Sequence, residues 1–305
     1  MTAVRDEATG VRSIDLADPR SGTLPRWTPG AHVDLVLGEF DRSYSLCGAP
    51  GAVTYTVSIL REDDGRGGSV HFHEALQPGM RLRLRGPRNH FPLDEDADAH
   101  LLIAGGIGIT PILPKADRLR FLGADYHLHY LGHSESCMAH LERVRRDHGD
   151  RLTIHDADQG NRADLRAIVA AIAPGTIVTA CGPDRMLSSL AELTADLPEG
   201  TLQVEHFTAE ADDPDNNRPF DVDLADSGFA LHVPAGKSLL SVLRAAGIDV
   251  ASDCEEGLCG SCEVRVLEGK IDHRDKVLSR AERSSGDRMM CCRSRADGSR
   301  LKLAL

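Results

Sequence analysis

Closely spaced cysteines near the C-terminal end constrain this chain more than any other feature. Five of its eight cysteines are Cys254, Cys259, Cys262, Cys291 and Cys292. In a reducing compartment, clustered cysteines indicate metal ligands before disulfides. The spacing C-x4-C-x2-C with a distant fourth cysteine is typical of a [2Fe–2S] cluster, in which two bridged irons need four thiolates. The end of the chain is therefore expected to fold around a tight metal-binding loop.

Two glycines between these cysteines fit such a loop. Gly257 and Gly260 permit positive φ angles and free the backbone amides to point at sulfur. A structural zinc site is the alternative, but zinc is usually held by two short C-x2–4-C hooks. Here the second half offers only the adjacent cysteines, which favours iron–sulfur over zinc. Either Cys291 or Cys292 supplies the fourth ligand.

Composition narrows the class of protein. The chain has 305 residues, enough for two or three domains, and a formal charge of 35 − 47 = −12. An acidic chain without a Lys/Arg-dense tract is a poor candidate for nucleic-acid binding. No apolar run approaches the roughly 18 residues of a membrane span, and the N-terminal residues lack the apolar core of a secretory signal. We expect a cytoplasmic monomer with no nucleic-acid or membrane partner.

The first segment, residues 1–97, alternates short apolar runs with Gly/Pro turns. This pattern predicts a small antiparallel β-barrel. Strands are predicted over residues 32–37, 53–60 and 80–84. A short helix is predicted over residues 70–76, with Ser69 as its N-cap.

The second segment, residues 98–208, changes to alternating strands and helices, which predicts a parallel sheet covered by helices. Strands are predicted over residues 100–104, 126–131, 153–156 and 177–180, and helices from the glycine-rich turn to about residue 122 and over residues 138–147 and 165–172. The acidic stretch 209–219 is predicted to be a linker. Residues 220–305 are strand-rich, with one helix predicted over residues 238–246.

Two short motifs in the first segment are candidate phosphate and ring contacts. The tetrad Arg42-Ser43-Tyr44-Ser45 lies in a predicted strand, and alone it is also explained by a strand with a polar outer face. The triplet Gly67-Gly68-Ser69 precedes the short helix. Glycines at a helix N-terminus offer free amides at the positive end of the helix dipole, which suits a phosphate.

Two further loops lie at the ends of predicted strands in the second segment. They contain Gly105, Gly106, Gly108, Thr110 and Pro111 in one loop, and Cys181, Gly182 and Pro183 in the other. The first is not the G-x-G-x-x-G fingerprint, but its glycines similarly let a backbone approach a pyrophosphate at a helix N-terminus. A tight strand–helix turn is the simpler explanation for either loop alone.

Taken together and in this order, the motifs resemble the phthalate dioxygenase reductase family. The resemblance is most specific in Cys254-Glu-Glu-Gly-Leu-Cys-Gly-Ser-Cys262, Asp272-His-Arg-Asp275 and Cys292-Arg-Ser-Arg-Ala296. It implies a multidomain protein with an antiparallel β-barrel flavin domain, an α/β parallel-sheet NAD(P) domain and a β-grasp domain like that of plant-type ferredoxins. It also favours Cys292 as the fourth cluster ligand, since 29 residues separate it from Cys262.

The resemblance assigns roles to the other motifs. Arg42 is expected to hold the flavin phosphate together with Gly67, Gly68 and Ser69. Tyr44 is expected to pack on the flavin ring, and Ser45 to bond its edge, with Ser43 in the same motif. Cys181 is expected near the nicotinamide, and Phe207 beside the flavin where the nicotinamide enters.

These parts imply an electron relay. A nicotinamide delivers two electrons as a hydride and a [2Fe–2S] cluster accepts one, so a flavin has to connect them, and no side chain need act as an acid or base. We expect FMN rather than FAD, NADH with NADPH as the alternative, and a Rieske-type or haem oxygenase as partner. The alternatives are a reductase of free flavins or small acceptors, and a non-enzymatic nucleotide sensor that contains zinc.

Overall fold

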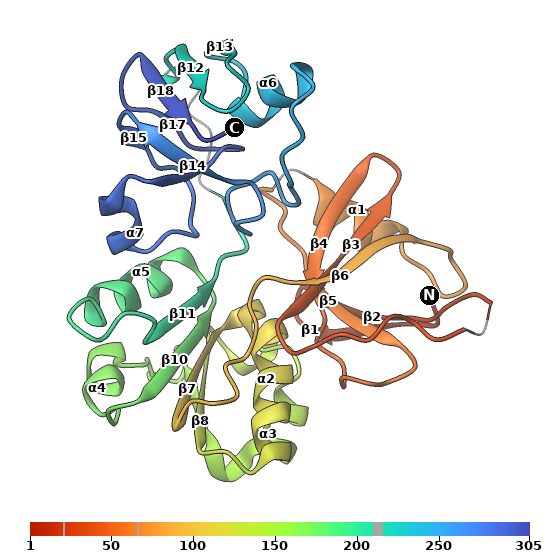
Figure 1. Ribbon diagram of the computed structural model, residues 1–305. Helices are drawn as coiled ribbons and strands as arrows, with labels where there is room; N and C mark the ends of the chain where they lie inside the picture. Colours follow the sequence, from red (N-terminus) through yellow and green to blue (C-terminus); the bar gives the residue numbers. More distant parts are fainter. Residues whose placement is uncertain (21, 66, 210–215) are drawn as a thin grey trace. The chain divides into compact units, whose positions relative to one another are not determined.

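The computed structural model describes residues 1–20, 22–65, 67–209 and 216–305. Most of the predicted linker, residues 209–219, thus lies outside the described residues. The chain forms two compact units, Met1–Glu205 and His206–Leu305 (Figure 1). No helix in the described ranges is long and apolar enough to cross a membrane.

The first unit begins with two antiparallel three-stranded sheets, in the orders β1-β2-β5 and β4-β3-β6. An isolated bridge between Leu46 and Val57 joins the two sheets into a barrel-like layer. The strands are β1 (Ala3–Ala8), β2 (Val11–Leu16), β3 (Ala31–Leu37), β4 (Phe40–Ser45), β5 (Tyr55–Leu60) and β6 (Arg83–Asn89). Alternate residues point inward, as the period of a strand requires, so Ile14, Val33 and Val57 are fully buried. The strand predicted at residues 80–84 corresponds to β6, which begins later, at Arg83, and ends later, at Asn89.

Helix α1 (Gly68–Ala75) begins two residues earlier than predicted. Its N-cap is Gly67, which adopts a left-handed conformation with φ of 78°, and no side chain caps the helix. The prediction that Ser69 is the cap was wrong. Ser69 lies in the first turn, where its hydroxyl accepts a hydrogen bond from the Glu62 amide at 3.0 Å. Glycine allows this early entry because it has no Cβ to resist positive φ.

The rest of the first unit is a five-stranded parallel sheet in the order β11-β10-β7-β8-β9. Its strands are β7 (Ala99–Gly105), β8 (Tyr126–Gly132), β9 (Leu152–Asp156), β10 (Thr176–Cys181) and β11 (Leu202–Glu205). Its helices are α2 (Ile109–Leu122), α3 (Leu141–His148), α4 (Leu165–Ala170) and α5 (Asp184–Leu193). Helices α2 and α3 cover one face and α4 and α5 the other (Figure 1). This confirms the predicted parallel sheet.

A buried polar network links the barrel strands to the loop before α3. The Ser58 hydroxyl lies 2.8 Å from Nε2 of His140 and 2.7 Å from the Ser13 hydroxyl. Nδ1 of His140 lies 3.2 Å from the Glu7 carboxylate. Burial alone would lower the pKa of His140, but hydrogen bonds with Cys47 and Glu7 outweigh it and raise the pKa to about 9. His140 is therefore a cation held inside the first unit.

The second unit is a five-stranded sheet in the order β13-β12-β18-β14-β16, with a two-stranded pair β15-β17. Its strands are β12 (Phe220–Leu224), β13 (Ala230–Val233), β14 (Glu263–Glu268), β15 (Ile271–Asp272), β16 (Arg288–Met290), β17 (Arg295–Ala296) and β18 (Arg300–Leu303). Helices α6 (Leu239–Ala245) and α7 (Arg280–Ser285) complete it. The predicted helix at residues 238–246 is confirmed, with Ser238 as its N-cap. Leu239, Leu240 and Leu243 of α6 pack into the core of the sheet.

Replacing Glu7 by Gln removes the ionised partner of buried His140. Because Glu7 is partly exposed, we expect a loss of about 2 kcal/mol, below the usual cost of breaking a buried pair, and a fall in Tm of about 5 °C at pH 7. The folded pKa of His140, about 9, exceeds its ordinary value of 6.5, so the wild type should lose stability as pH rises from 6.5 through 9. In the variant this slope should flatten, as measured by thermal unfolding from pH 6 to 10.

Glu74→Gln is the matched control, because the Glu74 side chain is 66% exposed and lies 3.5 Å from Arg61. It should leave both Tm and the pH slope within error of the wild type. If Tm of Glu7→Gln depends on pH as steeply as Tm of the wild type, the Glu7–His140 pair does not control the pH dependence of stability.

Candidate functional site

The guanidinium of Arg42 lies against the N-terminus of α1. A Cβ placed on Gly68, the first residue of the helix, would lie 2.8 Å from Nε of Arg42. The first turn contains no acidic residue and its N-cap contributes no side chain. A guanidinium beside free helix amides is a fitting receptor for one phosphate group. The structure thus brings Arg42 together with the predicted Gly67-Gly68-Ser69 turn.

The remaining residues of the tetrad divide between the two faces of β4. Tyr44 packs edge-on against Phe72 of α1, with ring centroids 5.7 Å apart, and burial raises the pKa of its hydroxyl above the ordinary range. Ser43 points to the opposite face and donates a 2.6 Å hydrogen bond to the Asp34 carboxylate. The hydroxyl of Ser43 is therefore engaged with the barrel, whereas Arg42 and Tyr44 share the face next to α1.

The two glycine-containing loops of the parallel sheet meet backbone to backbone. Strands β7 and β10 are neighbours, in parallel register from Ala99 and Thr176 onward. A Cβ on Gly108 would lie 2.2 Å from the carbonyl oxygen of Cys181, and one on Gly182 would lie 2.9 Å from Cα of Gly105. Only glycine fits at such separations. The glycines of each loop are therefore required by the close approach of the other loop's backbone.

The start of α2 follows directly from this contact. Gly106 to Gly108 form a 3-10 turn, and Gly106 has a positive φ of 54°. Thr110 is buried and its hydroxyl donates to the carbonyl of Ile107 at 3.0 Å. Pro111 is buried in the first helical turn, where its missing N–H has no helical partner to lose. These two residues therefore shape the helix start that presents its amides at the carboxyl edge of the sheet.

Buried ionisable groups for which the sequence motifs predict no role gather behind this edge of the sheet. Glu205 ends β11 and pairs in register with Cys181 of β10. Burial, partly offset by Lys115 and by a hydrogen bond from Ser45, raises the pKa of Glu205 to about 7. Burial likewise raises the pKa of the Cys181 thiol well above its ordinary value. Burial therefore favours the neutral form of the Glu205 carboxyl.

Lys115 is the least expected member of this group, since it is 0% exposed. Its ammonium donates to the Pro92 carbonyl at 3.1 Å and lies 3.3 Å from the centre of the Phe91 ring. Burial lowers its pKa to about 7, although Glu205 acts in the opposite direction. Its spacing from Ile112 and Leu119 places it on the apolar stripe of α2, a signal that the sequence already contained.

In the second unit, Cys254, Cys259 and Cys262 lie on one loop with the backbone needed for a metal cluster. Gly257 and Gly260 have positive φ angles of 71° and 81°, as the sequence required. The Cys254 sulfur accepts hydrogen bonds from two amides of the same loop, at 3.3 and 3.4 Å. A hydrogen bond from Cys254 lowers the pKa of the Cys259 thiol to about 5. Close sulfur atoms surrounded by amide donors fit a [2Fe–2S] cluster.

The adjacent cysteines face different surroundings. The sulfur of Cys292 interacts with the sulfurs of Cys262 and Cys254 and accepts a hydrogen bond from the Gly257 amide. The sulfur of Cys291 interacts with Cys262 and with Arg244 of α6, and its side chain is fully buried in the hydrophobic core. Of the two cysteines, Cys292 therefore makes more contacts with the cysteine loop.

Asp275 ties the cysteine loop to the segment after Cys292. Its buried carboxylate accepts hydrogen bonds from the Leu278 amide at 2.9 Å and the Ser294 hydroxyl at 3.1 Å. The amide of Lys276, next in sequence, donates to the Gly257 carbonyl at 2.9 Å. In the sequence Asp275 is only part of the motif Asp272–Asp275, whereas in the structure it supports the loop.

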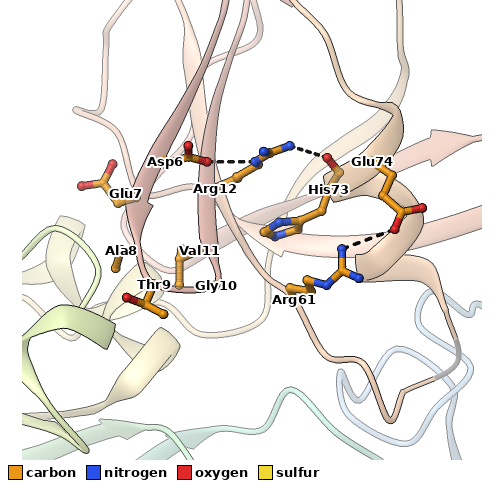
Figure 2. A pocket seen from close by; sticks show the side chains of 10 residues that line it. All are labelled: Asp6, Glu7, Ala8, Thr9, Gly10, Val11, Arg12, Arg61, His73 and Glu74. Atoms are coloured by element: carbon orange, nitrogen blue, oxygen red, sulfur yellow. Dashed lines mark hydrogen bonds and ion pairs between the residues drawn. The ribbon is translucent and has the colours of Figure 1, made fainter.

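A separate hollow of about 790 Å³ lies beside the β1–β2 hairpin (Figure 2). Four of its charged side chains form two pairs, Arg12 with Asp6 at 2.9 Å and Arg61 with Glu74 at 3.5 Å. None of the motif residues lines it. We therefore assign the hollow no part in cofactor binding.

The fold and these sites define an oxidoreductase that transfers electrons through a flavin and a [2Fe–2S] cluster. The family model described as "2Fe-2S iron-sulfur cluster binding domain" matches residues 222–297. Phenoxybenzoate dioxygenase subunit beta of Ectopseudomonas oleovorans is 39% identical over 306 residues, covering 99% of this chain and 95% of that protein. The chain belongs to the phthalate dioxygenase reductase family.

Two solved structures agree with this conclusion. Phthalate dioxygenase reductase, described as a modular structure for electron transfer from pyridine nucleotides to [2Fe–2S], is 34% identical with a TM-score of 0.71 and is covered over 96% of its length. Full-length CYP116B46 from Tepidiphilus thermophilus is 50% identical with a TM-score of 0.91. This chain is covered completely by that match but spans only 41% of the CYP116B46 chain. The protein is thus an oxygenase reductase component.

Gly108→Ala tests the contact between the two loops. Its Cβ would meet the Cys181 carbonyl, so we expect the loops to separate, Tm to fall by several degrees, and NADH-dependent flavin reduction to slow at least tenfold. Gly149→Ala is the control, because nothing lies within 4 Å of its Cβ and its φ of −44° suits alanine. Equal flavin reduction rates in the two variants, measured by stopped flow, would contradict this prediction.

Lys115→Met tests the buried ammonium. The folded pKa of Lys115, about 7, lies below its ordinary value of 10.5, so its charge destabilises the fold most below pH 7 and not at all above pH 10.5. Methionine has a similar length and no charge. We expect the variant to raise Tm, with the gain shrinking as pH rises from 6 to 10. A lower Tm at pH 6 would show that the ammonium stabilises the fold.

Proposed function

We propose that this chain carries electrons from NADH through FMN and a [2Fe–2S] cluster to a haem monooxygenase. The observation that carries the choice of acceptor is the match to CYP116B46, at 50% identity over the whole chain. A ring-hydroxylating dioxygenase is the second candidate, favoured by the 39% identity to the phenoxybenzoate dioxygenase subunit. A bound flavin accepts a hydride and releases electrons singly; the side chains of this protein hold and orient the cofactors.

The cradle formed by Arg42 and the α1 N-terminus supports FMN rather than FAD. One guanidinium and one helix end balance the charge of a single terminal phosphate. Gly68 lets the Arg42 guanidinium lie directly against the backbone of the turn, Gly67 supplies the left-handed N-cap, and Ser69 extends the same turn. Tyr44 and Ser45 would then contact the ring, with Glu205 behind Ser45.

Carboxylates at the carboxyl end of β9 support NADH over NADPH. Asp156 ends β9, and Asp158 pairs with His133, which follows β8, at 3.2 Å. Ligands bind at this edge of a parallel sheet, where an acidic group suits a ribose hydroxyl and repels a 2′-phosphate. The loops at Gly105 and Cys181 would hold the rest of the dinucleotide. Phe207 belongs to the second unit and is 42% exposed, and its place beside the flavin stays a prediction.

The fourth cluster ligand is proposed to be Cys292, together with Cys254, Cys259 and Cys262. We expect Cys292→Ser to lose or destabilise the cluster, because a hydroxyl is a harder ligand than a thiolate. Cys291→Ser is the matched neighbour and should keep two irons and two sulfides per chain. NADH should still reduce the flavin in both variants. The reverse pattern of iron loss would transfer the assignment to Cys291, and zinc in place of iron would refute the cluster.

The acceptor is tested with the NADH-reduced full chain and two purified oxygenases. These are the haem part of CYP116B46, followed by the carbon monoxide difference spectrum, and the oxygenase partner of phthalate dioxygenase reductase. We expect reduction of the haem protein to be at least tenfold faster and to fail in Cys292→Ser. The opposite preference would establish the dioxygenase, and fast reduction of free flavin alone would refute both candidates.

Arg42→Gln tests the flavin assignment. Losing the guanidinium should weaken flavin binding about tenfold or more, since a charge-assisted bond to a phosphate contributes about 1.5–3 kcal/mol. Flavin is released by heat, identified by chromatography against FMN and FAD, and counted per chain. Arg20→Gln is the control, because Arg20 is 91% exposed. Recovery of FAD from the wild type would overturn the FMN proposal.

A further inference from the structure

Lys115 places a charge on the face of α2 that packs against the parallel sheet. It lies three residues from Ile112 and four from Leu119, which are both fully buried in the same core. An apolar side chain would complete this stripe without burying an ammonium, which costs free energy. A buried charge that breaks such a pattern is typical of a functional position. The surroundings of Lys115 therefore indicate its role.

The ammonium of Lys115 has more donors than there are acceptors around it. It donates to the Pro92 carbonyl at 3.1 Å and lies over the face of the Phe91 ring. A lysine ammonium carries three N–H donors. In the part of the chain that the structure describes, Lys115 has no second hydrogen-bond acceptor. Its charge is therefore left to interact with charged groups at longer range.

The acidic group that faces Lys115 is Glu205, at the end of β11. Its Oε2 atom is buried and has no hydrogen-bond partner among the described residues. Burial is the largest influence on the pKa of either group and favours the neutral forms, but each charge shifts the pKa of the other in the opposite direction. The attraction thus favours an ionised carboxylate opposite the ammonium.

Two further titratable groups face this pair. Cys181 of β10 is near both Lys115 and Glu205, and burial raises the pKa of its thiol well above the ordinary value, so the thiol is neutral. His100 of β7 is near Lys115, and burial lowers the pKa of its imidazole, which is therefore neutral at pH 7. Neither group replaces Glu205 as the counter-charge of Lys115.

Glu205 connects Lys115 to the flavin motif. The hydroxyl of Ser45, the last residue of β4, forms a hydrogen bond with the Glu205 carboxyl. Under the proposed function, on which this inference rests, Ser45 also contacts the flavin ring. Lys115 therefore acts on this contact through the charge of Glu205.

We propose that Lys115 is a positioning residue: it keeps Glu205 ionised, so that this carboxylate takes up the proton left by hydride transfer. A hydride consists of two electrons and one proton, so one proton has to leave the flavin when both electrons have passed to the cluster. Ser45 relays it, because its O–H proton goes to Glu205 while the hydroxyl receives the proton from the flavin. Glu205 then returns the proton to solvent before the next hydride arrives.

The ionisation of Glu205 is measured first, by infrared spectroscopy of the oxidised full chain with flavin and cluster bound. The C=O band of a protonated carboxyl that disappears in Glu205→Gln belongs to Glu205. In the wild type this band should be half-developed at about pH 7, the pKa of the carboxyl. In Lys115→Met its midpoint should lie about one pH unit or more higher, because the opposite charge is removed. An unshifted midpoint would overturn the proposal.

Transfer of the proton is measured by stopped flow with NADH and cytochrome c, a one-electron acceptor. In Lys115→Met, NADH should bleach the flavin at close to the wild-type rate, since the hydride step precedes loss of the proton. The second electron should reach cytochrome c more slowly by about tenfold or more, with a larger solvent isotope effect. Glu205→Gln should slow the same electron, and adding Lys115→Met to it should slow that electron no further.

Arg120→Met is the matched control, because it removes a positive charge from the same helix but its side chain is 58% exposed. It should leave the carboxyl band and the transfer of both electrons as in the wild type. Flavin and iron content, measured in every sample, exclude misfolding. A shifted band with an unchanged second electron, or additive slowing in the double variant, would overturn the proposal and leave the flavin reductase in place. Failure of NADH to bleach the wild-type flavin would instead refute the proposed function.

Discussion

The contact between the glycine turn after β7 and the turn after β10 is the constraint on which the nucleotide side of this protein depends. Gly108 approaches the carbonyl of Cys181 so closely that any side chain would push the strands' ends apart. The approach fixes the start of α2, and with it the direction of the free amides at the carboxyl edge of the sheet. Cys181 in turn pairs in register with Glu205 of the neighbouring strand β11. The steric contact and this strand pairing together place the helix amides, the thiol and the carboxyl at one edge of the sheet.

Much of this architecture could be predicted from the sequence because its signals are local. The parallel sheet follows from apolar runs that alternate with helical stretches, and the cysteine loop follows from spacing and two glycines. Errors occurred where glycine or a left-handed residue moved a boundary. Gly67 starts α1 before Ser69, and His140 in a left-handed conformation delays α3 to Leu141. Backbone angles of this kind are not visible in a periodic pattern.

The residues of the candidate site could be predicted from short motifs and from the resemblance, but their contacts could not. The resemblance assigned Arg42 and Gly68 to the same phosphate, but the contact between them depends on how β4 packs against α1. Lys115 and Glu205 were overlooked because a charged residue in a sequence is normally assigned to the surface, and only burial shows that these two lie inside. Asp275 was quoted within a motif, yet its support of the loop beside Cys292 required the positions of Ser294 and Leu278.

The buried contact of His140 with Glu7 bears on how such reductases can exchange parts during evolution. Glu7 comes from the first strand of the chain, whereas His140 follows a 3-10 turn in the nucleotide-binding half. A crossover between these two positions would join segments from two parent proteins. If the parent that supplies one segment lacks Glu7 or His140, the hybrid would contain a buried charge without its partner. A crossover near residue 205 keeps both together. Recombination between related genes should therefore preserve the first unit whole and exchange the iron–sulfur unit more freely.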